Sequence, residues 1–588
     1  MHGFHQRLLS IDMNNHTFSI EAIPDDLIKD TLGGKGLASY LLLKHNPQGV
    51  DPFDGANHLI FTLGPVTDTV VWGGSRYGVY SKSPQTGFYS ESYSGGKAAE
   101  YMSRSGFDAF MIYGKSKTPV WLEINEKGAT FHHAEELWGK ETYEAEDYVK
   151  AWIKEHRPQV KGCAALTIGP GGENGVAFSV IENDYWRSAG RTGAGAVMGS
   201  KNIKAVGFWG HRKREVADRK KLLDMAKKFS NEFKTHPATD AYKSMGTPMM
   251  VDIMSSVGSF PTRYWHQGKA PHQDAINAKA LHERCTVKPN ACRKCFIACG
   301  RLSTVKSGRH AGLKMEGPEY ETIYTFGGLC MVDNIEDIAY LNDICDRLGI
   351  DTISAGNLVA MTIEASKQGK TDYAIDYGQT DQIAALLHDI ANCKGIGKIL
   401  AKGIKSAAIE LGMEDQAIHV KGLEPAGYDP RVLKGMGLSY GTSPRGACHL
   451  RTTFYKPELA KMIPPQQIEG KARMLVDWEN RLIIFDCLVL CRFYRDFYQW
   501  ESLADLIGTI TGMEWDKAAL WAVASRVSDN TRRFNLREGL KQTHDKLPKR
   551  FYTELLPETG EVITEGDMDQ LLVDYYAERG WDQKGLVG

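Results

Sequence analysis

The sequence predicts an α+β protein in which a strand-rich N-terminal domain precedes two mainly helical domains. Short apolar runs separated by glycine-rich loops dominate as far as about residue 210. After residue 211, apolar residues recur at three- and four-residue steps, which is the spacing of amphipathic helices. A length of 588 residues suits about three or four domains. We therefore expect domains over residues 1–210, 211–417 and 418–588.

Two groups of short strands are predicted in the N-terminal domain. Residues 8–13 and 17–22 flank Asn14-Asn15, a pair that favours a hairpin turn. Residues 110–113, 120–124 and 129–132 are expected to form another short meander. Four glycine-rich loops stand out: GGSRYG (73–78), SYSGGK (92–97), GPGGENG (169–175) and SAGRTGAGAVMGSKN (188–202). Either these loops expose backbone amides that could bind phosphate or a flat polar ring, or they are ordinary turns. None of them fits a dinucleotide-binding or P-loop fingerprint.

Helical periodicity runs through most of the remaining chain. It predicts helices over residues 216–233, 335–348 and 383–390. Residues 419–431 contain several glycines and prolines, interrupt this pattern and mark the expected domain boundary. Helices are expected to resume from about residue 466 and to continue to the C-terminus.

Composition and charge argue against some classes of protein. The 71 Lys and Arg residues and 72 Asp and Glu residues give a formal net charge of -1, which argues against a wholly basic nucleic-acid-binding surface. The longest apolar stretch, around residues 482–491, is interrupted by Asp486 and is shorter than the ~20 residues needed to span a bilayer. The N-terminus shows no basic segment followed by an apolar one, so we expect a cytoplasmic protein without a membrane span.

The strongest local motif is Cys292-x2-Cys295-x3-Cys299. Thiolates at this spacing in one loop can converge on a metal centre, with a fourth ligand from elsewhere. A radical-SAM motif has the reverse spacing, and no second close Cys/His pair supports a structural zinc site. Iron–sulfur ligation is therefore favoured over zinc and over buried cysteines that bind no metal.

Carboxylates and one histidine are candidates for proton transfer. The segment EGPEYET (316–322) contains Glu321 and two further glutamates, which either include a buried proton acceptor or form a solvated cluster. His449 in RGACHL either acts in the chemistry or has a packing role. Asp346 and Asp486 end apolar helical segments in similar D-x-x-x-[IL]-[DC] patterns, a recurrence that chance could also produce.

Together these motifs resemble the tungsten-dependent aldehyde:ferredoxin oxidoreductase family over nearly the whole chain. The resemblance begins at LGGKGL (32–37) and continues through GPVTDT, GGSRYGVYSKSPQTGF, SGG and RSAGRTGAGAVMGSKNIKA. It proceeds through CRKCFIACG, EGPEYET, DRLGIDTIS, YDPR and RGACH to RRFNLREGL and LPKRF. Each motif is weak alone, but so many in the order of the family make the resemblance specific.

The resemblance implies a tungsten (or molybdenum) bis-pyranopterin carried by the β-rich N-terminal domain, beside one 4Fe–4S cluster. The two pterins would hold the metal without a protein ligand, and Mg²⁺ would bridge their phosphates. The cluster ligands would be Cys292, Cys295, Cys299 and the distant Cys491. The residues that contact the pterin cofactor would be Arg76, Tyr93, Gly95, Arg187, Ser188, Gly190, Asp346, Ile350, Asp351, Arg451, Asp486 and Leu490.

The implied reaction is the reversible oxidation of aldehydes to carboxylic acids in an anaerobic metabolism. Glu321 would accept a proton as water attacks, and His449 would donate a hydrogen bond to the developing oxyanion. Electrons would leave through the cluster to ferredoxin or to an iron–sulfur partner subunit, in a homo- or hetero-oligomer that the sequence does not define. One alternative is a subunit that reduces aromatic-ring thioesters, which should lack Glu321 and His449. The other is a non-catalytic iron–sulfur electron-transfer protein, in which the two aspartate motifs would have no purpose.

Five positions depart from the pattern of the family. Val489 replaces a usual glycine, which predicts a slightly reshaped pterin pocket. Tyr93 replaces a common asparagine, and a contact through its backbone carbonyl would survive the change. Tyr340 and Asp343 replace an E-x-x-H pair that binds iron between subunits in some members, so we expect neither that iron nor its dimer. Arg451 replaces a common lysine and keeps the charge.

Overall fold

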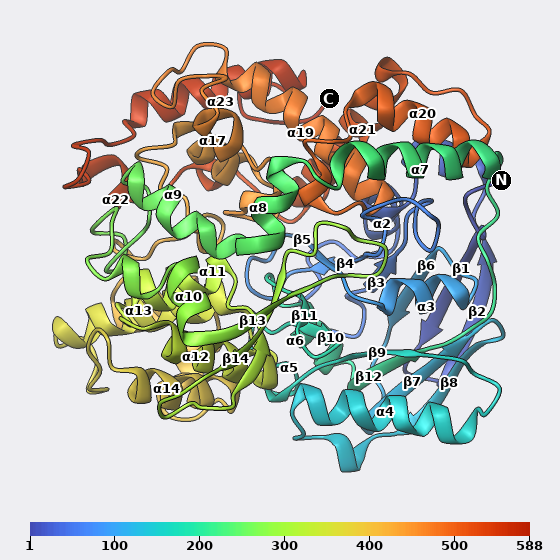
Figure 1. The fold of residues 1–588 in the computed structure, drawn as a ribbon, viewed down its shortest axis with the longest axis horizontal. Coiled ribbons are helices and arrows are strands. Elements are labelled where there is room, and N and C mark those ends of the chain that lie inside the picture. The colour runs from blue at the N-terminus through green and yellow to red at the C-terminus, as the bar shows by residue number, and fades with distance from the viewer.

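The computed structural model describes all residues from 1 to 588, and it is an α+β protein with two six-stranded sheets in its N-terminal region. Figure 1 shows the sheets at the right and the helical regions at the left and top. The first sheet has the order β2-β1-β6-β3-β4-β5. Its strands are β1 (Arg7–Asp12), β2 (Thr17–Ala22), β3 (Leu59–Thr62), β4 (Tyr77–Lys82), β5 (Tyr89–Ser94) and β6 (Ala109–Tyr113). The hairpin predicted around Asn14-Asn15 is confirmed, because β1 and β2 pair antiparallel.

The second sheet has the order β11-β10-β9-β12-β7-β8. Its strands are β7 (Val120–Asn125), β8 (Gly128–His133), β9 (Ala164–Thr167), β10 (Ile181–Asn183), β11 (Arg187–Ala189) and β12 (Ile203–Phe208). The meander predicted over residues 110–132 is wrong in one respect, because only β7 and β8 pair with each other. β6 instead lies in the first sheet, parallel to β1 and antiparallel to β3.

A small third sheet, which the sequence did not predict, frames the cysteine motif. Its strands are β13 (Cys285–Asn290), β14 (Gly300–Val305) and β15 (Lys314–Glu316), in the order β13-β14-β15. Residues 291–299 form the connection between the antiparallel strands β13 and β14. This hairpin therefore fixes both ends of the cysteine loop.

Helices surround the sheets and make up most of the chain after residue 211. The helices before that point are α1 (Asp25–Thr31), α2 (Gly34–His45), α3 (Ala98–Arg104), α4 (Thr142–His156), α5 (Pro170–Glu173) and α6 (Ala194–Ser200). The next helices are α7 (Arg219–Phe233), α8 (Pro237–Met245), α9 (Met250–Ser256), α10 (Ala278–Arg284), α11 (Tyr320–Thr322), α12 (Ile335–Leu348), α13 (Thr352–Lys367), α14 (Thr380–Ala391), α15 (Gly397–Leu400) and α16 (Ile404–Leu411). The last helices are α17 (Lys434–Thr442), α18 (Tyr455–Leu459), α19 (Lys471–Leu488), α20 (Trp500–Thr511), α21 (Lys517–Arg537), α22 (Lys549–Thr553) and α23 (Glu565–Arg579).

The predicted helices α7, α12 and α14 are confirmed, as is the break at residues 419–431. Helices resume at α17, earlier than the predicted residue 466. The apolar periodicity of α17 is weak in the sequence because several of its positions are glycines. These glycines let neighbouring groups approach the helix backbone. A Cβ added at Gly435 would come within 3.0 Å of the ring of Phe454, and one at Gly441 would come as close to the carbonyl oxygen of Asp545.

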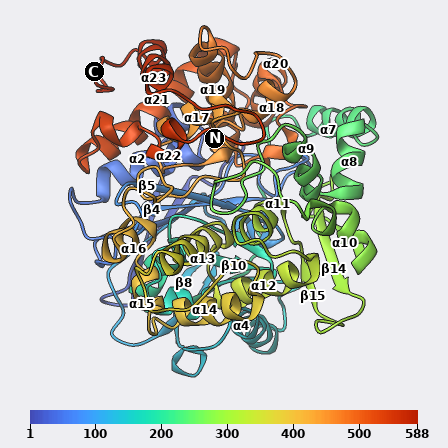
Figure 2. The same ribbon diagram turned by 90° about the vertical axis from the view of Figure 1, so that its left-hand side faces the viewer.

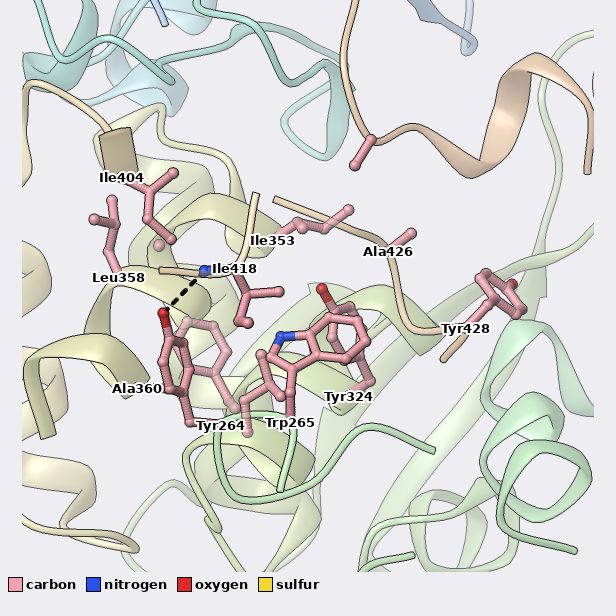
Figure 3. Close-up of a cluster of buried hydrophobic side chains, with 14 of the residues drawn as sticks. Tyr264, Trp265, Tyr324, Ile353, Leu358, Ala360, Ile404, Ile418, Ala426 and Tyr428 are labelled. Carbon is pink, nitrogen blue, oxygen red and sulfur yellow. Dashed lines mark hydrogen bonds between the residues drawn. The ribbon is translucent and has the colours of Figure 1, made fainter. Parts of the chain in front are cut away.

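The largest hydrophobic core joins the helical regions to one another. Figure 2 shows α13 to α16 in front of strands of the N-terminal sheets. Within this core, Figure 3 shows Tyr264 and Trp265 among aliphatic side chains. Tyr264 accepts a hydrogen bond from the backbone N–H of Ile418 at 3.3 Å, and Trp265 donates one to Asn357 Oδ1 at 3.1 Å. No helix in the chain combines the length and the apolar character that a bilayer crossing would need.

Candidate functional site

Two helix ends from different parts of the chain meet the two sheets in the same manner. Asp346 lies in the last turn of α12, which ends at Gly349 in a left-handed conformation with φ of 70°. Asp486 lies in the last turn of α19, which ends at Val489 with φ of 55°. A β-branched residue in this conformation costs about 1–2 kcal/mol. Val489 therefore keeps the backbone shape that a glycine would adopt, and the two aspartate motifs form matching caps.

Glycines of the N-terminal loops allow each cap to pack directly on the sheet. Gly64 follows β3, and a Cβ added there would come within 3.0 Å of the carbonyl oxygen of Leu488. Gly169 follows β9, and a Cβ there would come equally close to the carbonyl oxygen of Leu348. Backbone lies against backbone at both places, so each aspartate is held at a fixed position relative to one sheet.

All four predicted cluster ligands line one cavity of about 270 Å³. Cys292, Cys295 and Cys299 lie on the β13–β14 loop, and Cys491 lies just beyond α19. Burial and the neighbouring thiol of Cys491 raise the pKa of Cys295 to about 11. The backbone N–H of Gly96 donates to Cys292 Sγ at 3.2 Å. No three His, Cys, Asp or Glu side chains lie close enough to hold a single metal ion, whereas four thiols around one cavity suit an iron–sulfur cluster.

A second cavity of about 370 Å³ adjoins the cysteine cavity and shares residues with it. Arg76 and Tyr93 line both cavities, and the Arg76 guanidinium donates to the carbonyl oxygen of Tyr93 at 3.0 Å. The backbone carbonyl of Tyr93 thus accepts a hydrogen bond at the cavity, so a contact at this position does not require an asparagine side chain. A Cβ added at Gly95 would lie 2.8 Å from Cys292 Sγ, so this position needs glycine.

Most of the predicted pterin-contacting residues line these two cavities. Arg187 and Gly95 line the cysteine cavity, Ser188 lines both, and Gly190, Asp346, Ile350 and Asp351 line the larger one. Asp346 Oδ2 accepts a hydrogen bond from Asn342 Nδ2 at 2.9 Å. Burial, reinforced by the nearby carboxylates of Glu182 and Asp343, raises the pKa of Asp346 well above its ordinary value. This environment favours the protonated carboxyl group, which can donate as well as accept a hydrogen bond.

Three predicted residues lie behind the cavity wall. Asp486, Arg451 and Leu490 line neither cavity. Asp486 Oδ2 instead accepts from Arg451 at 2.8 Å and from Arg492 at 2.6 Å, and Arg492 lines the larger cavity. The carboxylate of Asp486 thereby orients a cavity-lining arginine.

Glu321 and His449 meet in the larger cavity. The distance from His449 Nε2 to Glu321 Oε1 is 3.5 Å, and the backbone N–H of Gly427 donates to Glu321 Oε2 at 3.1 Å. Burial raises the pKa of Glu321 to about 8. Burial and nearby arginines, Arg191 first, lower the pKa of His449 well below its ordinary value. At neutral pH the pair is therefore mostly a carboxylic acid beside a neutral imidazole.

The sequence analysis missed four arginines on this cavity: Arg191, Arg445, Arg492 and Arg495. Arg191 and Arg445 are buried, and each has a side-chain Nε without a hydrogen-bond partner. Arg445 also donates to Cys448 Sγ at 2.8 Å. Buried donors without partners suit an anionic ligand such as a phosphate. Their place in the motifs RSAGR and SPRGACHL was the only signal in the sequence.

Comparison with known proteins accounts for this architecture. Residues 8–210 match the family model "Aldehyde ferredoxin oxidoreductase, N-terminal domain", and residues 224–588 match "Aldehyde ferredoxin oxidoreductase, domains 2 & 3". The chain belongs to the aldehyde ferredoxin oxidoreductase family. As a member of this family of oxidoreductases, it is 32% identical to the tungsten-containing aldehyde ferredoxin oxidoreductase of Pyrococcus furiosus, over 100% of this chain and 98% of that protein. It is 33% identical, with the same coverage, to the enzyme of that name from Thermococcus kodakarensis.

More distant relatives of this aldehyde ferredoxin oxidoreductase family member carry other names. The WOR-like subunit of an aliphatic sulfonate oxidoreductase from Pyrococcus furiosus is 27% identical over 100% of this chain and 96% of that protein. The structure of the active site complex BamBC of benzoyl coenzyme A reductase superposes with a TM-score of 0.83 at 22% identity, covering 100% of this chain and 96% of that chain. This likeness shows that the fold is shared.

Proposed function

We propose that the protein reversibly oxidises aldehydes to carboxylic acids at a tungsten bis-pyranopterin. The observation that carries this proposal is the Glu321–His449 pair, 3.5 Å apart in a cavity that adjoins the four cysteines. Full-length relatives at 32% and 33% identity are named as tungsten-containing aldehyde ferredoxin oxidoreductases, which supports the same metal and substrate class here. Molybdenum would fit equally, since no protein side chain is required as a ligand.

The residues on the cavity walls fit such a cofactor. Asp346 and Asp351 on one cap, and Arg492 oriented by Asp486 on the other, would hold the two pterins. The unpartnered donors of Arg191 and Arg445 would bind the anionic phosphates of the cofactor, whose remaining charge Mg²⁺ would neutralise. When bound, this cofactor would polarise the carbonyl and take up the electrons released.

The chain would supply the proton chemistry of the reaction. One aldehyde and one water yield a carboxylate, two electrons and three protons, so proton acceptors are needed. Ionised Glu321 would accept a proton from water as its oxygen bonds to the carbonyl carbon, and a pKa of about 8 suits this task near neutral pH. Neutral His449 would donate its N–H to the developing oxyanion and pass protons through its other nitrogen.

Electrons would leave one at a time through a 4Fe–4S cluster bound by Cys292, Cys295, Cys299 and Cys491. The chain has thiols for this one cluster, so the proposal includes ferredoxin or an iron–sulfur partner subunit as acceptor. Association with such a subunit would make the enzyme a hetero-oligomer, and a homo-oligomer is the alternative.

A reductase subunit for aromatic-ring thioesters is the second candidate, because the benzoyl coenzyme A reductase complex shares the fold. Elemental analysis of protein purified without oxygen, combined with an aldehyde panel and a low-potential dye, separates the candidates. Tungsten, iron and dye reduction by aldehydes are expected. Reduction of an aromatic thioester without aldehyde turnover would refute the proposal, as would iron without tungsten or molybdenum, which indicates a non-catalytic electron carrier.

A further inference from the structure

The larger cavity contains a buried arginine that none of the roles above requires. Arg495 follows the short 3₁₀ turn Arg492–Tyr494, a few residues beyond Cys491. It lines the cavity, and only 1% of its surface is exposed. Few charged side chains are buried to this extent without a partner, because burial of an unpaired charge costs several kcal/mol.

One edge of the Arg495 guanidinium makes no hydrogen bond of regular geometry, although the phenol of Tyr242 lies close to the side chain. Its Nη1 donates to the carbonyl oxygen of Arg492 at 2.8 Å. Its Nε and Nη2 are buried and make no hydrogen bond, and the side chain forms no ion pair. The adjacent Asp496 does not satisfy it, since that carboxylate pairs with Lys456 at 2.6 Å. The free edge therefore consists of the two N–H groups that bind a carboxylate side-on.

The other cavity arginines differ from Arg495 in their surroundings. Arg492 pairs with Asp486 at 2.6 Å, and Arg191 lies 3.8 Å from Asp351. Both therefore belong to the aspartate caps. The charge of Arg495 is instead flanked by the phenols of Tyr455 and Tyr242 and by the carboxylate of Asp496, which forms no ion pair with it. The two tyrosines also line the cavity, and neither belongs to an aspartate cap.

An aromatic wall connects Arg495 to the acid–imidazole pair. The ring of Tyr428 lies 5.7 Å from that of His449 and stacks on Tyr455 at 4.1 Å. The phenol of Tyr455 in turn lies near the charge of Arg495. A substrate along this wall would have its reacting carbon near His449 and its distal end near Arg495.

We propose that Arg495 is a carboxylate-binding residue for the substrate, so that the preferred aldehydes carry a second, anionic carboxylate group. This inference rests on the proposed aldehyde oxidation. The planar carboxylate would accept two parallel hydrogen bonds from Nε and Nη2, and its charge would neutralise the buried guanidinium. A neutral aldehyde would leave that edge unpaired, which lowers its specificity constant.

The test compares aldehydes of equal carbon number with and without a carboxylate. Wild-type holoenzyme is assayed anoxically with a low-potential dye on glyoxylate, succinic semialdehyde and adipic semialdehyde, against acetaldehyde, butanal and hexanal. We expect a higher kcat/KM for the carboxylated member of at least one pair. In Arg495→Gln, kcat/KM for that substrate should fall about thirtyfold or more, mainly through KM, while the neutral partner changes little. Arg495→Lys should recover only part of the loss, because an ammonium lacks the fork.

Controls separate this role from cofactor binding and from folding. Arg481→Gln removes a buried arginine that lines neither cavity, and it should change neither kcat/KM. Succinate should raise the melting temperature of wild type and not of Arg495→Gln.

Tungsten and iron contents should match those of wild type in all variants. Loss of tungsten in Arg495→Gln would assign the arginine to a cofactor phosphate and overturn the proposal. Equal losses for both substrates, or a wild-type preference for neutral aldehydes in every pair, would also overturn it. Absence of turnover with every aldehyde would instead refute the proposed function itself.

Discussion

Replacement of Glu321 by glutamine tests the proton chemistry directly. The variant keeps the size of the side chain, and its amide oxygen can still accept the hydrogen bond from the Gly427 N–H, which spans 3.1 Å in the wild type. It removes the only acidic side chain within 4.0 Å of His449. General base catalysis contributes about 10²–10⁴-fold, so kcat/KM should fall by that factor while the metal contents stay unchanged.

The pKa of Glu321 predicts a pH dependence of kcat/KM, which tests the same hypothesis independently. With a pKa of about 8, the ionised fraction rises from about one-tenth at pH 7 to about nine-tenths at pH 9. The wild-type kcat/KM should therefore increase about tenfold over this range, and this increase should be absent from any residual activity of Glu321→Gln. The assay is anoxic dye reduction with saturating dye and an aldehyde well below its KM.

Glu458→Gln is the matched control. Glu458 is also buried, has its pKa raised to about 7 by burial, and accepts hydrogen bonds from the backbone N–H of Gly435 at 2.8 Å and from Lys471 at 2.6 Å. It lines neither cavity, so its replacement should leave kcat/KM and its pH dependence unchanged. A Glu321→Gln enzyme with wild-type activity, or a wild-type profile that is flat from pH 7 to 9, would remove Glu321 from the mechanism.

Three further outcomes are expected. Gly64→Ala should lower the free energy of unfolding by about 1–3 kcal/mol and reduce the tungsten content, because the new Cβ would collide with the carbonyl of Leu488. As a control, Ala in place of the exposed Gly566 in α23 should leave the tungsten content unchanged and should leave the stability unchanged or slightly raised. Cys295→Ser should lose the iron absorbance, and retention of a full iron complement would contradict its role as ligand. His419, whose Nδ1 accepts a backbone N–H, has its pKa lowered to about 4 by burial, so between pH 6.5 and 4 the unfolded chain binds more protons than the native one. Stability should therefore fall by up to about 3 kcal/mol as the pH drops through this window, and denaturant titrations should show a weaker loss for His419→Gln.

Local features of the fold were predictable, whereas its long-range pairings were not. The β1–β2 hairpin depends on two strands and the turn between them, and all three are visible in consecutive residues. β6 joined the wrong group in the sequence analysis because its partners, β1 and β3, precede it by many residues. The small β13–β14 hairpin escaped notice since its strands are partly exposed, lack a strong apolar alternation and flank the cysteine motif.

The candidate site shows the same division. Cysteine spacing pointed to an iron–sulfur cluster, and the motifs of the family pointed to Glu321 and His449. The structure brings these two side chains to 3.5 Å. Arg495 could not be singled out, because the absence of a partner is a property of the folded chain. An arginine in CRFYRDF looks like any surface cation until its neighbours are known, and only its burial with two free N–H groups distinguishes it.

The seating of both helix caps on glycine backbones also bears on how the protein is put together. Gly64 and Gly169 leave no slack between the sheets and the caps, and the residues they touch come much later in the chain. A group as large as the proposed bis-pyranopterin could not pass between backbones that are packed this closely. We therefore expect the cofactor to be inserted before α12 and α19 dock onto the sheets.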